Sequence, residues 1–131
     1  MIQLKSLKTG NIIQPDYVKL DGLHNMVIYT PDHKEMLGRA LILEPENKEY
    51  PPVLLDIYIY DEENRRKGAA DDLMEVICET FPVVITGKST TRGRSLCLKH
   101  GFKEQMSDKG AFLVYTMPPE KMYPPTRKKG D

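Results

Sequence analysis

The sequence predicts an α/β domain built on a mixed, largely antiparallel β-sheet, with one central pair of parallel strands and helices on both faces. A β-prone run at residues 52–60, a helical pattern at 67–80 and a second β-prone run at 83–86 form a strand–helix–strand unit, which makes its two strands parallel. The β-prone runs outside this unit are joined by short turns, which is typical of antiparallel pairing. A chain of 131 residues that is 40% hydrophobic and 29% charged fits one globular domain, which we assign to residues 1–117.

Strand character dominates the chain before the central unit. Three segments alternate apolar and polar side chains or are rich in β-formers: residues 2–7, 26–30 and 36–44. The last two flank a turn that begins at Pro31, which predicts a hairpin. Residues 11–22 receive no firm element, because Pro15 and Asp21-Gly22 interrupt them.

Helical periodicity occurs twice after the central strand. In residues 67–80, apolar side chains recur at three- and four-residue steps, as in an amphipathic helix that Pro82 ends: Ala70, Leu73, Met74, Ile77 and Phe81. Residues 90–100 have helical composition, with Ser89 or Thr90 as N-cap and Gly101 as the stop. The last two strands are expected at residues 102–105 and 111–117.

The C-terminal residues differ in composition from the domain. Four prolines between positions 118 and 125 exclude a helix or a central strand. Four cations make the segment basic: Lys121, Arg127, Lys128 and Lys129. We expect residues 118–131 to form an extended or disordered tail.

The overall composition excludes several classes of protein. Lys plus Arg equals Asp plus Glu, at 19 each, so binding to a nucleic acid would need a local basic patch. The two cysteines are too few for a disulfide-stabilised miniprotein, and no Cys/His spacing fits a metal site. The sequence contains no apolar run of membrane-spanning length and no signal-peptide pattern. We therefore expect a cytoplasmic protein without a bound metal.

Three consecutive cations lie where the first long helix follows the central strand. Arg65, Arg66 and Lys67 precede Gly68 and Ala69, whose small side chains leave the backbone uncovered. The first N–H groups of a helix lack intrahelical acceptors and carry the positive end of its dipole, so they favour an anion such as a diphosphate. The alternative is a solvated basic turn that balances the neighbouring acidic residues.

Two segments resemble the GNAT N-acetyltransferase superfamily. Arg65-Arg66-Lys67-Gly68-Ala69-Ala70 is similar to the family's Arg/Gln-x-x-Gly-x-Gly/Ala motif and, like it, follows a hydrophobic strand. The run from Ser95 to Phe102, Ser-Leu-Cys-Leu-Lys-His-Gly-Phe, resembles the family's helix-to-strand segment. The resemblance covers about residues 26–117.

The resemblance implies a reaction and its donor substrate. Members transfer an acetyl group from acetyl-CoA to a primary amine, by direct attack within a ternary complex. It implies that six residues bind the pyrophosphate: Arg65, Arg66, Lys67, Gly68, Ala69 and Ala70. The pantetheine arm would pair with the backbone of Ile59 and Tyr60, and a strand N–H would stabilise the oxyanion.

Catalytic candidates come from the second motif and the central strand. Cys97 stands where the family often has the tyrosine that protonates the leaving thiolate, and the alternative is a small apolar residue packed between helix and sheet. Asp56 interrupts an apolar strand and is the candidate base, the alternative being a carboxylate that pairs with a cation or faces water. Tyr58 shares its face and is a second candidate, for proton relay or for contact with the acceptor.

The N-terminal region departs from the family pattern, which has two helices before its second strand. About 25 residues precede Met26 here, without a helix pair. The acceptor side is therefore expected to be open, or completed by a homodimer partner, and to suit a macromolecular amine such as a protein or aminoacyl-tRNA. The alternative function is a module with weak or no activity that binds acyl-CoA or a protein partner as a regulator.

A further group of cations remains after these assignments. Lys88, Arg92, Arg94 and Lys99 lie on or beside the predicted second helix. They are candidates to bind the 3′-phosphate of coenzyme A or RNA, and the alternative is a solvated helix face.

Overall fold

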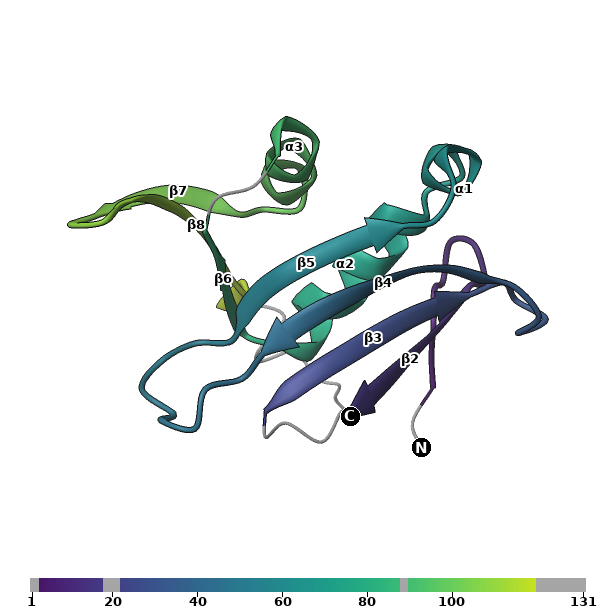
Figure 1. Ribbon diagram of the computed structural model, residues 1–131, viewed down its shortest axis with the longest axis horizontal. Coiled ribbons are helices and arrows are strands. Elements are labelled where there is room, and N and C mark those ends of the chain that lie inside the picture. Colours follow the sequence, from purple (N-terminus) through teal and green to yellow (C-terminus); the bar gives the residue numbers. More distant parts are fainter. Residues whose placement is uncertain (1–2, 18–21, 88–89, 120–131) are drawn as a thin grey trace.

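Eight strands of the described residues form one sheet, in the order β1-β2-β3-β4-β5-β6-β8-β7 (Figure 1). The computed structural model describes residues 3–17, 22–87 and 90–119. All neighbouring pairs in this sheet are antiparallel except β5 and β6, which are parallel. The predicted mixed sheet with one central parallel pair is therefore confirmed. The strands are β1 (Leu4–Lys5), β2 (Ile12–Tyr17), β3 (Leu23–Tyr29), β4 (Met36–Leu43), β5 (Val53–Ile59), β6 (Val83–Thr86), β7 (Lys103–Ser107) and β8 (Gly110–Thr116).

Strand β2 was not predicted, because Pro15 lies in its middle. It pairs along its whole length with β3, and Pro15 lies opposite Met26. On its other side, β1 pairs with Ile12 and Ile13 alone. Beyond Ile13 the strand is therefore at the edge of the sheet, where a residue without an N–H costs no ladder hydrogen bond.

Helix α2 (Ala69–Thr80) covers one face of the central strands (Figure 1). The fully buried residues of this layer come from the helix and from strands β3 and β4: Leu73, Met74, Ile77, Met26, Ile28, Ala40 and Ile42. Buried residues recur along β3 and β4, interrupted by partly buried ones in β3 and mostly by exposed ones in β4, as in strands with one face in the core.

The opposite face of these strands is open over much of β4 and β5. Arg39, Asp56 and Tyr58 are exposed on it, and Arg39 lies directly opposite Tyr58 in the ladder. No described helix packs over this part of the sheet. The described residues before β3 form β1 and β2 at the sheet edge and contain no helix pair.

Two short elements refine the predicted helices. Helix α1 (Glu62–Arg66) was not foreseen, and Asp61 caps it by accepting a hydrogen bond from the N–H of Glu63 at 3.0 Å. Helix α2 then begins at Ala69 instead of Lys67, because Gly68 adopts a left-handed conformation with φ of 87°. Helix α3 (Thr91–Lys99) matches the prediction, and Thr90 caps it through a hydrogen bond from the N–H of Gly93.

Some predictions concern residues outside the described part of the chain. The predicted tail begins at Pro118, but residues 120–131 lie outside the described residues, as do Lys88 and Ser89. Within the described ranges, no helix is both long and apolar enough to cross a membrane.

Candidate functional site

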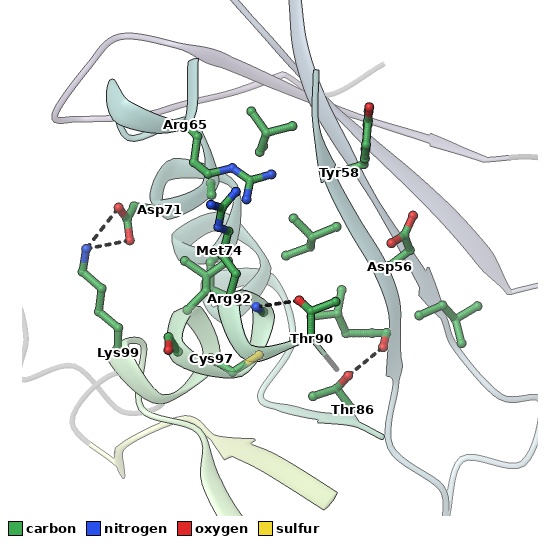
Figure 2. Close-up of a pocket in the computed structure, with 18 residues that line it drawn as sticks. Asp56, Tyr58, Arg65, Asp71, Met74, Thr86, Thr90, Arg92, Cys97 and Lys99 are labelled. Atoms are coloured by element: carbon green, nitrogen blue, oxygen red, sulfur yellow. Dashed lines mark hydrogen bonds and ion pairs between the residues drawn. The ribbon is translucent and has the colours of Figure 1, made fainter. Parts of the chain in front are cut away.

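The parallel strands β5 and β6 are paired at one end and separate at the other. They pair at Val53 and Ile85, and the N–H of Ile85 donates to the carbonyl of Pro52 at 2.9 Å. The hydroxyl of Thr86 donates to the carbonyl of Leu54 at 3.1 Å, one residue beyond the paired position on each strand. Beyond it, a cavity of about 790 Å³ opens between β5, α2 and α3 (Figure 2).

A bulge in β5 determines which backbone groups face this cavity. Ile42 of β4 lies opposite Leu54, whereas Leu41 lies opposite Asp56, so Leu55 is an extra residue in the ladder. Further along, the N–H of Tyr60 donates to the carbonyl of Leu37 in β4. Peptide groups of a strand point alternately to its two sides, so those of Ile57 and Ile59 point away from β4 and toward the cavity. The predicted backbone site thus includes Ile59, whereas the N–H of Tyr60 is engaged in the sheet.

The N-terminus of α2 lies at the mouth of the gap. Gly68 precedes the helix with no side-chain cap, and its carbonyl accepts the first helical hydrogen bond, from the N–H of Asp72. The N–H groups of Ala69, Ala70 and Asp71 therefore have no acceptor within the helix. A Cβ added at Gly68 would meet no atom within 4 Å, so the approach to this backbone is open. The arrangement suits an anion.

Of the three predicted cations, Arg65 is the one that enters the cavity. Its guanidinium lies in the cavity wall (Figure 2), and its buried Nε has no hydrogen-bond partner. Among the described residues, Arg65 has no ion pair. By contrast, Arg66 is 74% exposed and lies 3.9 Å from Glu63, and Lys67 is exposed outside the cavity wall. A cation that is partly buried without an acidic partner favours a bound anion.

Cys97 contributes the thiol that lines the cavity from α3 (Figure 2). Burial raises the pKa of this thiol from 9.0 to about 11. The thiol therefore remains protonated near neutral pH, which suits a proton donor and disfavours a nucleophile, since the thiolate is the reactive form.

Asp56 and Tyr58 belong to the same wall, but their side chains project from the other side of β5 (Figure 2). Both are exposed, and the ring of Tyr58 lies edge-to-face with that of Tyr60, with centroids 5.3 Å apart. Asp56 has no ion pair or side-chain hydrogen bond among the described residues. It therefore does not pair with a described cation, and it faces water or acts as a base. Strand β5 thus separates the cavity from an exposed carboxylate.

Helix α3 brings further charged groups to the cavity. Arg92 lies 3.2 Å from Glu62 of α1, and Lys99 lies 3.0 Å from Asp71 of α2. His100 Nε2 also lies 2.8 Å from Asp71. Partial burial alone raises the pKa of Asp71, but the hydrogen bonds from His100 and Lys99 lower it overall. These pairs connect α3 to both helices that precede it.

The structure brings together about half of the predicted site residues. Those in the cavity wall are Asp56, Tyr58, Ile59, Arg65, Ala70 and Cys97. Those outside it are Tyr60, Arg66, Lys67, Gly68 and Ala69, the last of which is buried in the core. The predictions for site residues omitted Leu55, Thr86, Thr90 and Met74, which have no chemical signal in the sequence. Across the described residues, no group of three His, Cys, Asp or Glu side chains forms a metal-binding cluster.

No protein-family model and no curated protein matches this sequence. Among solved structures, the chain is similar to one from Desulfovibrio desulfuricans that is assigned to the GNAT family of acetyltransferases. The TM-score is 0.57 and the identity 14%, over 74% of this chain and 71% of the other. The chain has the GNAT fold.

Two further structures are similar at lower scores. One is a protein from Bordetella pertussis assigned to the GNAT family, with a TM-score of 0.46 and 16% identity over 70% of this chain and 63% of the other. The second is a protein of unknown function from Aquifex aeolicus, with a TM-score of 0.48 and 10% identity over 89% of this chain and 76% of the other. Both TM-scores lie below 0.5, so the GNAT fold assignment rests on the first structure, and at 14% identity it concerns the fold and not the reaction.

Proposed function

We propose that this protein is an N-acetyltransferase that transfers an acetyl group from acetyl-CoA to a primary amine. The observation that supports it most is the gap between β5 and β6, where an uncapped helix N-terminus and the unpaired Arg65 meet one cavity. The GNAT fold adds to it, since the resemblance of the two sequence motifs implies the same donor.

The donor would lie along the gap. Its pyrophosphate would accept hydrogen bonds from the open N–H groups of α2 and from Arg65. Its pantetheine arm would pair with the cavity-facing peptide groups of Ile57 and Ile59. The thioester would then reach the bulge at Leu55, where the ladder with β4 is interrupted and a backbone N–H can stabilise an oxyanion.

The reaction would proceed by direct attack. The amine nitrogen attacks the thioester carbonyl carbon from the open side of β5, and Asp56 accepts a proton from the amine, directly or through water. The C–N bond forms, the C–S bond of the tetrahedral intermediate breaks, and the departing thiolate takes a proton from Cys97. Solvent then returns a proton to the Cys97 thiolate. Tyr58 would contact the acceptor beside Asp56.

The acceptor would be a macromolecular amine, on a protein or an aminoacyl-tRNA. Arg39, Asp56 and Tyr58 are exposed, and no described helix encloses them. This surface does not enclose a small metabolite, whereas a segment of a macromolecule can lie across the strands. A homodimer partner that covers this face is the alternative arrangement. The cytoplasmic location that the sequence predicts is part of the same proposal.

A second candidate function is a module that binds acyl-CoA without turnover and acts as a regulator. The observation in its favour is Cys97, since a thiol stands where the family often has a tyrosine, while the uncapped N-terminus of α2 and Arg65 still border the cavity. Such a regulator would bind acyl-CoA at the same site as the proposed enzyme but would not transfer the acyl group to an amine.

Calorimetric titration with acetyl-CoA and with free coenzyme A tests the donor site. Saturable micromolar binding supports the proposal, and release of free thiol in the presence of amines or amine-bearing peptides then separates the enzyme from the regulator. Absence of binding to both ligands contradicts both candidate functions.

A further inference from the structure

An ion pair joins α1 to α3 at the cavity. Nη1 of Arg92 lies 3.2 Å from Oε1 of Glu62, and the two residues are separated by 30 positions in the chain. Arg92 lines the cavity together with Arg65, and Glu62 does not (Figure 2). Arg92 therefore borders the cavity, whereas its acidic partner Glu62 lies outside it.

The pair is one of several on α1 and α3, but it differs from the others in position. Arg66 with Glu63 and Arg94 with Glu104 are also paired through exposed side chains, at 3.9 and 2.9 Å. None of these four residues borders the cavity. Of Arg66, Arg92 and Arg94, Arg92 alone borders the cavity, so a ligand bound there can replace its partner Glu62.

The chemistry favours such an exchange. The side chains of Arg92 and Glu62 are 62% and 54% exposed, and an ion pair at that exposure contributes little stability. A phosphate group carries up to two charges and several acceptor oxygens, and arginine binds it through two parallel hydrogen bonds. Arg65, which has no ion pair among the described residues, borders the same cavity. A phosphate in contact with both guanidinium groups therefore binds Arg92 more favourably than the carboxylate of Glu62 does.

We infer that Arg92 is a second phosphate-binding residue and that Glu62 masks it in the unliganded protein. Binding of the donor transfers Arg92 from Glu62 to a phosphate of the ligand, and Glu62 is released to solvent. Arg65 from α1 and Arg92 from α3 then hold the ligand from two sides of the gap. This inference rests on the proposed function, since the phosphate belongs to an acyl-CoA.

Charge-neutral variants of both partners test the exchange by calorimetry with coenzyme A at low salt. Glu62→Gln removes the competitor and should tighten binding about two- to fivefold, the range of an exposed ion pair. Arg92→Gln should weaken binding about tenfold, as for a lost charge-assisted hydrogen bond. In the double variant, Glu62→Gln should no longer tighten binding, because the residue that it releases is missing.

The chain offers matched controls for both changes. Glu63→Gln alters the neighbouring residue of the same helix, and Arg94→Gln alters α3 outside the cavity. Both should leave the affinity within about twofold, since exposed charges away from a site act weakly. Repeating the series with dephospho-coenzyme A identifies the group: an effect of Glu62→Gln that disappears assigns the 3′-phosphate, and one that persists assigns the diphosphate.

Three results would overturn the inference, and they distinguish it from the proposed function. If the wild-type protein binds coenzyme A but Glu62→Gln and Arg92→Gln behave like their controls, the exchange does not occur and the donor site stands. The same conclusion follows if Glu62→Gln tightens binding equally with and without Arg92. If the wild-type protein binds no coenzyme A, the proposed function and the inference are both wrong.

Discussion

The two sides of β5 are built differently. On the cavity side, the thiol of Cys97 is buried, Arg65 is partly buried, and both lie between α2, α3 and the separated end of the parallel pair. On the other side, Asp56 and Tyr58 are exposed on a face of β5 that no described helix covers. The same strand thus borders a preformed site and an open surface.

This difference indicates which of the two proposed substrates, donor or acceptor, the chain can select without a partner. The cavity side presents fixed backbone donors and, in Arg65, a cation without an ion pair among the described residues, and such groups are preorganised for the proposed phosphate ligand. The open side presents a carboxylate and two tyrosines on an unenclosed surface. Selectivity for the proposed acceptor would therefore come from the acceptor's own size or from a second chain.

The largest effect should follow a change at Gly68, which precedes α2 in the proposed phosphate site. Gly68→Glu places a carboxylate at the start of α2 and a side chain at a φ of 87°. Repulsion and strain together should weaken the binding of acetyl-CoA about a hundredfold or more, as measured by calorimetry. Gly110→Glu is the control, because Gly110 also has a positive φ and open space around it but begins β8, away from the cavity wall. A folded Gly68→Glu protein with unchanged affinity would place the donor elsewhere.

Loss of the cavity thiol should affect turnover more than binding. Cys97→Ser replaces the proton donor by a much weaker acid, so kcat should fall about a hundredfold while KM for acetyl-CoA stays within about threefold. Thiol release with an amine acceptor measures both constants. Cys78→Ser changes a second buried cysteine, which is outside the cavity wall, and should retain near wild-type kcat. Equal losses in the two variants would assign Cys97 a packing role.

The three cations of the motif should divide into one that binds and two that do not. Arg65→Gln removes the guanidinium in the cavity and should weaken coenzyme A binding about ten- to thirtyfold. Arg66→Gln removes an exposed partner of Glu63 and should change the affinity by less than about twofold. Calorimetry at two salt concentrations compares them. A larger loss for Arg66 would mean that this loop rearranges around the ligand.

A smaller effect is expected on the open side. Asp56→Asn removes the candidate base and should lower kcat about tenfold, a modest loss because water also reaches this exposed position. Asp16→Asn is the matched control, since Asp16 is an acidic residue of β2 in the same sheet, separated from β5 by two strands. Turnover at saturating acetyl-CoA compares them. Full activity of Asp56→Asn would leave the open side without a catalytic residue.

The sequence predicts the elements that depend on local periodicity. The apolar residues of α2, the β-formers of β5 and β6, and the capping residue Thr90 all produce patterns within a few positions, and the structure contains these elements. The candidate anion site at residues 65–70 is visible in the sequence because its residues are consecutive, and its binding of a phosphate stays a prediction. Which of its cations enters the cavity was not predictable, since that depends on the turn of α1, a helix that the sequence does not signal.

The features that the sequence did not predict depend on contacts between distant residues. The bulge at Leu55 exists because β4 and β5 pair in a particular register, and no residue type marks it. The pair of Arg92 and Glu62 joins positions 30 residues apart. Strand β2 was missed for a related reason, since Pro15 is acceptable there because β1 is too short to reach it.

The smallest expected effect concerns stability at alkaline pH. Burial raises the pKa of Cys97 from 9.0 to about 11, so the unfolded chain loses this proton at a lower pH than the folded protein does. The stabilisation is complete below about pH 9 and is lost as the pH rises toward 11. The Tm should therefore fall further over this interval in the wild type than in Cys97→Ser, by roughly 2–6 °C. Tyr115, whose pKa burial also raises, is present in both proteins and cancels in the comparison. Parallel melting curves would mean that the thiol reaches water and that the cavity is less closed than the structure indicates.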